Sequence, residues 1–141
     1  MTGVVQWLLP IDPAAHAQHQ PSDWRTRADA TEVWRAIGLS QDPSRWCLRS
    51  GFRTMAPGDR IWAYLSRRQE VCAVGRVHAV ESDEDGAHFV RVDWDERRTA
   101  ALCSDPLPRS TFDQVPMSTS RAGERAAAEL SRRYEQLAAS D

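Results

Sequence analysis

The sequence predicts an α+β fold in which helices pack around a sheet that is either strongly curved or closed into a small barrel. Five or six short strand patterns follow one another at close intervals, and helix patterns flank them at both ends. The length of 141 residues is that of one ordinary domain. We therefore expect a single domain over residues 1–141.

Strands are predicted where turn residues bound an apolar or alternating stretch. The first, Val4–Leu9, is stopped by Pro10 and Pro13, because proline cannot donate to a strand ladder. The others are expected at Arg45–Leu48, Arg60–Ser66, Val71–Glu81 and His88–Trp94. Ser82–Gly86 is an acidic turn between the last two.

Two helices are predicted. The first is Ala30–Ile37, with Asp29 or Thr31 as its N-cap and Gly38 as its stop. The second is a C-terminal helix at about residues 120–139, which follows a segment broken by prolines. Its apolar side chains recur on one face, as a buried stripe requires: Ala127, Leu130, Tyr134 and Leu137.

The strand Arg60–Ser66 has two unlike faces, because side chains alternate along a strand. Ile61, Ala63 and Leu65 form an aliphatic face that is expected to fill the interior. The other face carries Trp62, which we expect to pack beneath a helix.

Composition excludes several classes of protein. All 18 basic residues are arginines, so no phosphate-loop, Schiff-base or kinase lysine exists. The net charge of −2 argues against a binder that relies on strong, sequence-blind attraction to nucleic acid, although it leaves room for a local basic patch. Hydrolase motifs are absent, and no catalytic residue is predicted.

No cofactor or metal site is expected. Cys47, Cys72 and Cys103 are odd in number and lack the close spacing of a disulfide framework or a zinc site. No apolar run reaches the roughly 18 residues that a membrane-spanning helix needs, and the N-terminus lacks the features of a signal peptide. We expect a cytoplasmic protein without a membrane partner.

The 6 tryptophans are the clearest binding signal. Trp34, Trp62 and Trp94 lie within predicted elements and are interpreted as core. Trp7, Trp24 and Trp46 stand near element ends, next to prolines and polar residues, where an aromatic ring can line a pocket. Stacking on such rings contributes about 1–3 kcal/mol per unstacked base, so these three side chains are candidate base-binding residues.

Three segments, in order, resemble the EVE domains, members of the PUA-like superfamily related to YTH domains. They are W-L-L-P-I-D-P (Trp7–Pro13), W-C-L-R-S-G-F-R-T-M-A-P-G-D-R-I-W-A-Y (Trp46–Tyr64) and V-C-A-V-G-R-V (Val71–Val77). They are spread over residues 7–77, about half of the chain, and themselves make up 33 of its 141 residues. The resemblance implies a strongly curved mixed sheet with helices around it.

The resemblance also implies a function. EVE domains are thought to take a modified base of DNA or RNA into an aromatic pocket, and bacterial members are linked to restriction systems. If these family features apply to this chain, Trp46 is a wall of the pocket and Trp7 lies below or beside it. Tyr64 and Ser66 then face the same cavity. Arg49 is placed to contact a base edge or a phosphate. The expected partners are a nucleic acid with a modified base and a restriction or modification enzyme.

One departure from the family pattern affects the expected base preference. Pro10 and Ile11 stand where family members often carry polar residues, so a hydrogen bond made there is either missing or supplied by the backbone.

Two alternatives remain open. The first is an enzyme acting on a nucleotide or modified nucleoside, with Asp93, Asp95 or Glu70 as acid or base. The second is a protein-interaction module of a restriction or RNA-modification system. The base, the choice between DNA and RNA and the oligomeric state do not follow from the sequence.

Overall fold

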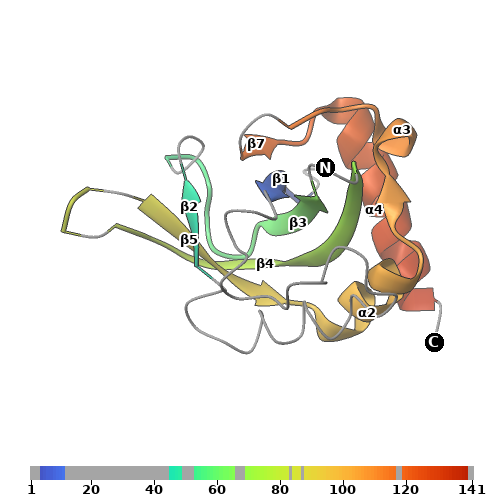
Figure 1. The fold of residues 1–141 in the computed structure, drawn as a ribbon, viewed down its shortest axis with the longest axis horizontal. Helices are drawn as coiled ribbons and strands as arrows, with labels where there is room; N and C mark the ends of the chain where they lie inside the picture. The colour runs from blue at the N-terminus through green and yellow to red at the C-terminus, as the bar shows by residue number, and fades with distance from the viewer. Residues whose placement is uncertain are drawn as a thin grey trace, which may run out of the picture.

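The structure, a computed structural model, describes residues 4–11, 45–48, 53–65, 69–82, 84–86, 88–116 and 119–139. These residues form a mixed α+β fold with one sheet and three helices (Figure 1). The strands are β1 (Gln6–Ile11), β2 (Arg45–Leu48), β3 (Arg60–Leu65), β4 (Glu70–Ser82), β5 (His88–Trp94), β6 (Leu107–Pro108) and β7 (Ser120–Arg121). The helices are α2 (Glu96–Ser104), α3 (Arg109–Phe112) and α4 (Glu124–Ala139).

The seven-stranded sheet is mixed and open. Its order is β2-β5-β4-β3-β1-β7, with β6 beside β4. The pair β1 and β3 is parallel, and every other pair among the described strands is antiparallel. Because β2 and β7 at the two ends of this order are not paired with each other, the described strands do not close into a barrel. The α+β class is confirmed, and the barrel alternative is not formed by this part of the chain.

Strand β4 bends because it carries two extra residues. Its register against β3 skips Cys72, and its register against β5 skips His78. Each extra residue is a bulge, which bends the strand and increases its local twist. Figure 1 shows the result: β4 runs the length of the sheet and curves sharply toward the helices.

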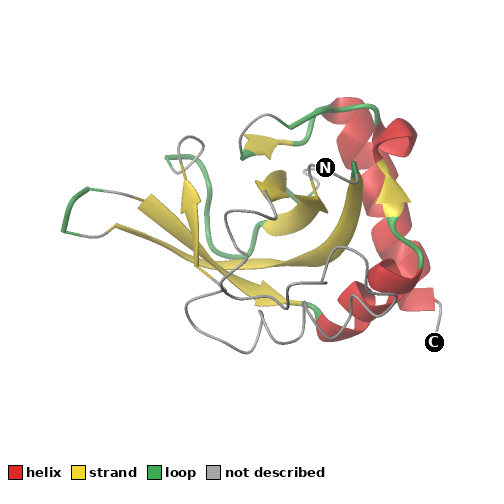
Figure 2. Cartoon of the chain, viewed as in Figure 1, coloured by secondary structure: helices red, strands yellow, loops and turns green. Residues whose placement is uncertain are grey.

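The sheet has a buried core on each face. The helix-side core joins β1, β3 and β4 to all three described helices, which lie together on one side of the sheet in Figure 2. It consists of Leu8, Trp62, Tyr64, Val71, Val74, Leu102, Leu107, Phe112, Ala126, Leu130 and Leu137. The far-side core consists of Trp7, Leu9, Met55, Ile61, Ala63, Ala73, Val77, Val90 and Val92.

The predicted strands are confirmed. β2 and β5 have the predicted bounds, and β1, β3 and β4 differ from theirs by one or two residues. The C-terminal helix begins at Glu124. Trp62 does pack under a helix, with its ring edge-to-face to Tyr134 of α4 at 6.2 Å between centroids. The predicted helix Ala30–Ile37 lies outside the described residues.

Helix α2 was not predicted. Its first turn, E-R-R-T, is polar and so gives no apolar stripe, and Asp95 before it is a candidate acid or base in the enzyme alternative. The structure shows that Asp95 is the N-cap, whose carboxylate accepts a hydrogen bond from the Arg98 backbone N–H at 2.9 Å. The short elements α3, β6 and β7 were also missed, because two to four residues carry no detectable periodicity.

Gly75 of β4 allows the close approach of β5. A Cβ atom there would lie 2.9 Å from both the Trp94 Cα and the Val92 Cγ1, too close for either pair. We expect Gly75→Ala to lower the free energy of unfolding in urea by about 1–3 kcal/mol, as overpacking does.

Gly123→Ala is the matched control for that substitution. A Cβ at Gly123 would meet only the end of the Gln114 side chain, at 3.4 Å, so a cost below about 1 kcal/mol is expected. Equal urea midpoints for Gly75→Ala and the unchanged protein would contradict this account of the β4–β5 pair.

Candidate functional site

A buried glutamine joins the sheet to helix α4. Gln6 is 3% exposed and lies in the apolar strand β1. Its Nε2 donates to the Ala127 carbonyl at 3.0 Å and to the Ser131 Oγ at 2.9 Å. Its Oε1 accepts from the Trp62 Nε1 at 2.9 Å and from the Arg60 Nη1 at 3.4 Å. A buried polar group needs such partners, since leaving one unsatisfied costs about 1–3 kcal/mol.

Helix α4 thereby brings Tyr134 between two arginines. The guanidinium carbons of Arg60 and Arg98 lie 3.5 Å and 3.7 Å from the centroid of the Tyr134 ring. Two guanidinium groups this close to one ring centroid would overlap if both lay on the same face of the ring. Arg60 and Arg98 therefore lie on opposite faces of the Tyr134 ring. A guanidinium over an aromatic ring contributes roughly 0.5–2 kcal/mol, depending on how well it is shielded from water.

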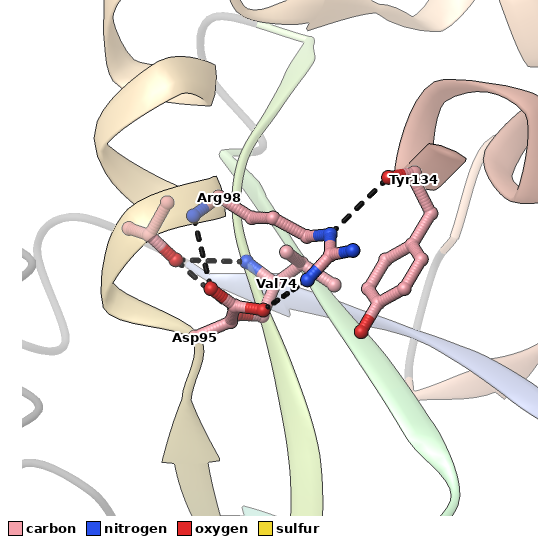
Figure 3. Close-up of polar contacts among 5 residues, drawn as sticks. Val74, Asp95, Arg98 and Tyr134 are labelled. Carbon is pink, nitrogen blue, oxygen red and sulfur yellow. Dashed lines mark hydrogen bonds and ion pairs between the residues drawn. The ribbon is translucent and has the colours of Figure 1, made fainter. Parts of the chain in front are cut away.

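Arg98 is held in this position from both sides, as Figure 3 shows. Its Nη1 donates to the Asp95 Oδ2 at 2.8 Å, and its Nε donates to the Tyr134 backbone carbonyl at 3.2 Å. The next residue, Thr99, bonds through its Oγ1 to the backbone N–H and carbonyl of Val74, each at 3.2 Å. These contacts fasten the first turn of α2 to β4.

A hollow of about 270 Å³ opens beside this cluster. It is lined by Gly75, Arg76, Asp93, Asp95 and Tyr134. The hollow therefore combines an aromatic ring with side chains of both charges, and it lies between the end of β5, the middle of β4 and helix α4.

Charges of both signs lie near the hollow. Asp95 is paired with Arg98, and Asp93 lies 3.0 Å from the His78 Nδ1. Arg76 stands directly opposite Arg60 in the β3–β4 register and directly opposite Asp93 in the β4–β5 register. Burial lowers the pKa of the Arg60 guanidinium; Tyr134 and the negative charge of Glu135 oppose this shift, and the positive charges of Arg98 and Arg76 add to it.

Trp7 is fixed on the other face of the sheet. It is 2% exposed, and its Nε1 donates to the Asp59 Oδ2 at 3.0 Å. The same oxygen accepts from the Ala56 backbone N–H at 2.9 Å. The turn Pro57-Gly58-Asp59 is thus tied to strand β1, 52 residues away in the sequence.

The expectation that Trp7 and Tyr64 share a cavity is wrong. Tyr64 is 2% exposed and belongs to the helix-side core, with its ring edge-to-face to Phe112 at 6.3 Å. Trp7 belongs to the far-side core. The reason is the register: Trp7 pairs with Ile61, an odd number of residues from Tyr64, so the two side chains point to opposite faces.

The remaining predicted site residues are only partly covered by the structure. Trp24, Arg49 and Ser66 lie outside the described residues. For Trp46 the backbone is described: it lies in β2 opposite Val90, a member of the far-side core that also contains Trp7. Pro10 pairs with Tyr64 in the β1–β3 register.

The three carboxylates of the enzyme alternative do not meet at one place. Asp93 and Asp95 line the hollow, whereas Glu70 is at the far end of β4, opposite Pro108. Both oxygens of Asp95 are already used, one by the N–H of Arg98 and one by its guanidinium. Asp95 therefore has a structural role, as the cap of α2.

The sequence did not indicate this cluster. It gave no role to Gln6, Arg60 and Arg98, and it placed Tyr134 in the buried stripe of the helix without predicting that its ring lies between two arginines. One signal was available, since Gln6 is a single amide within the apolar run V-V-Q-W-L-L-P. A polar residue at a buried strand position predicts a specific set of hydrogen-bond partners. The sequence around Arg60 and Arg98 does not predict their contact with Tyr134, because it does not reveal that helix α4 packs against them.

Comparisons of the chain with protein-family models, with curated proteins and with solved structures find no match. Within the residues that the structure describes, no helix has both the length and the apolar character needed to cross a membrane. The same residues contain no group of three or more His, Cys, Asp or Glu placed to hold a metal ion.

The helix-side core should become less stable at alkaline pH because of the buried phenol of Tyr64. Burial raises the pKa of its phenol above the ordinary value of about 10. Above pH 10 the unfolded chain then loses this proton while the folded chain keeps it, so the free energy of unfolding falls as pH rises.

We expect the urea midpoint to decline from about pH 10 upward more steeply in the unchanged protein than in Tyr64→Phe, which has no phenol at this position. Tyr134 is present in both proteins and serves as the internal control. Parallel midpoint profiles between pH 8 and pH 11 would contradict the burial of the Tyr64 hydroxyl.

Proposed function

We propose that the chain is a non-enzymatic binding module that recognises a modified nucleobase in DNA or RNA through an aromatic pocket, and that its fold is of the EVE type within the PUA-like superfamily. The support from the sequence is the ordered resemblance of three segments. A restriction or modification enzyme is the partner that this resemblance implies.

The observation that carries the proposal is the hydrogen bond from Trp7 to Asp59. It joins the first resembling segment to the P-G-D turn of the second, although they are far apart in the sequence. The third segment lies within β4, which pairs with β3, the strand that follows that turn. The three segments are thus neighbours around β3, which supports treating them as one unit.

In this proposal Trp46 is the wall on which the base stacks, and Trp7 supports the pocket from the core. Trp7 is too buried to stack on a base itself, because only 2% of its surface is exposed. Tyr64 is no longer part of the pocket, since it lies in the core on the other face. Base stacking contributes about 1–3 kcal/mol, and one buried methyl group adds about 0.8 kcal/mol.

These magnitudes define the test, which is a fluorescence anisotropy titration of labelled single strands. Strands that carry 5-methylcytosine or N6-methyladenine are compared with unmodified strands of the same sequence. We expect one modification to strengthen binding about fourfold, the factor that corresponds to one buried methyl group. Trp46→Ala should weaken binding of that strand by about 5- to 150-fold.

Val115→Ala is the control variant, because Val115 is 54% exposed and far in sequence from the resembling segments. It should bind as the unchanged protein does. Equal affinity for modified and unmodified strands, or an unchanged affinity in Trp46→Ala, would refute the proposed function.

A further inference from the structure

The charges that line the hollow beside Tyr134 balance one another. Asp95 is paired with Arg98 at 2.8 Å, and Asp93 stands directly opposite Arg76 in the β4–β5 register. An ion of either sign would be repelled by one member of the second pair. The lining therefore favours a neutral ligand that carries both hydrogen-bond donors and acceptors.

Arg76 and Asp93 place a donor group beside an acceptor group on the helix side of the sheet. Side chains directly opposite each other on neighbouring strands share a face, with Cβ atoms about 4.5–5.5 Å apart. Arg76 is also opposite Arg60, which lies two residues before Trp62 and so on the same face as this member of the helix-side core. The three side chains Arg60, Arg76 and Asp93 thus form a row across β3, β4 and β5.

Three polar groups at the hollow keep hydrogen-bonding capacity within the described part of the chain. The exposed Arg76 forms no hydrogen bond or ion pair there. The Asp93 side chain is 71% exposed, and only its Oδ2 has a polar neighbour, the His78 Nδ1 at 3.0 Å. The Tyr134 hydroxyl makes no hydrogen bond to any described residue. Because arginines cover both faces of the Tyr134 ring, a ligand in the hollow meets its hydroxyl and its edge.

The size of the hollow and the order of these groups suit one nucleobase. The volume of about 270 Å³ is slightly below the range of roughly 300–1,000 Å³ in which drug-sized ligands bind. A guanine base is neutral, and its edge carries two adjacent N–H donors, at N1 and N2, beside the O6 acceptor. A carboxylate can accept two parallel hydrogen bonds, and a guanidinium is a preferred donor to O6.

We propose that the hollow binds a guanine base by its edge. Asp93 accepts from N1 and N2, and Arg76 and the Tyr134 hydroxyl donate to O6. Adenine does not fit, because its amino group would face the guanidinium in the place of O6. The site lies on the helix side of the sheet, apart from the pocket proposed around Trp46, and the inference does not depend on the proposed function.

The test compares the trinucleotides dT-dG-dT and dT-dI-dT, because inosine differs from guanine only in lacking the N2 amino group. Binding is followed by NMR through the Arg76 Nε–H signal, which should shift, and that of Arg125, a 72% exposed side chain on α4, which should not. We expect the guanine strand to bind about three- to tenfold more tightly, the factor for one hydrogen bond.

Three variants separate the contacts. Asp93→Ala should bring the ratio of the two affinities to about one, because Asp93 is the partner of the N2 amino group. Arg76→Ala should weaken both strands equally and keep the ratio, because both strands carry O6. Arg125→Ala should change neither strand. Structural damage would weaken both strands alike and could not remove the ratio alone.

A second arm uses free guanosine and inosine in place of the strands. The same ratio between the nucleosides identifies a free base or nucleoside as sufficient for the site. A ratio that appears only with the trinucleotides identifies a base within a strand. Both results support the guanine site.

The inference is overturned if neither pair of ligands shows a ratio above one, if the ratio survives Asp93→Ala, or if Arg125→Ala weakens binding as much as Arg76→Ala. These ligands carry no modified base. A guanine site without any preference for 5-methylcytosine or N6-methyladenine refutes the proposed function alone, and a preference for a modified base without guanine discrimination refutes this inference alone.

Discussion

The buried amide of Gln6 is the contact on which the arrangement of this protein depends. Its side chain bonds to β3 and to α4 at once, through Trp62 on one side and through Ala127 and Ser131 on the other. An amide in an apolar strand is costly unless each of its atoms has a partner, so the hydrogen bonds fix both the rotation and the position of α4. That position places Tyr134 between Arg60 and Arg98, and the hollow follows from it.

The two faces of the sheet have separate roles in this account. On the far side, Trp7 and Asp59 tie β1 to the turn before β3, where the proposed base pocket is expected. On the helix side, the two bulges of β4 bend the sheet around the helices.

Local patterns predicted the strands well, because alternation and turn residues are properties of neighbouring residues. The alternation of Arg60–Leu65 correctly separated Ile61 and Ala63 from Trp62. The grouping of Trp7 with Tyr64 failed because it depends on the register between β1 and β3, which no local pattern determines. The site around Tyr134 was equally hidden, since it requires knowing where α4 crosses the sheet. The role of Asp95 as the N-cap of α2 was not predicted, because the first turn of this helix is polar and does not reveal that a helix begins there.

Amide hydrogen exchange of Gln6→Met tests the central claim most directly. Methionine is similar in size and lacks the amide, so it removes the bonds to Ala127 and Ser131 with little change in volume. Hydrogen exchange of the amides in α4 should become about 5- to 150-fold faster, which corresponds to the cost of about 1–3 kcal/mol for a buried polar group left without a partner. Exchange in β5 should change much less. Exchange that is unchanged in α4, or that rises equally in α4 and β5, would contradict the claim that Gln6 holds this helix on the sheet.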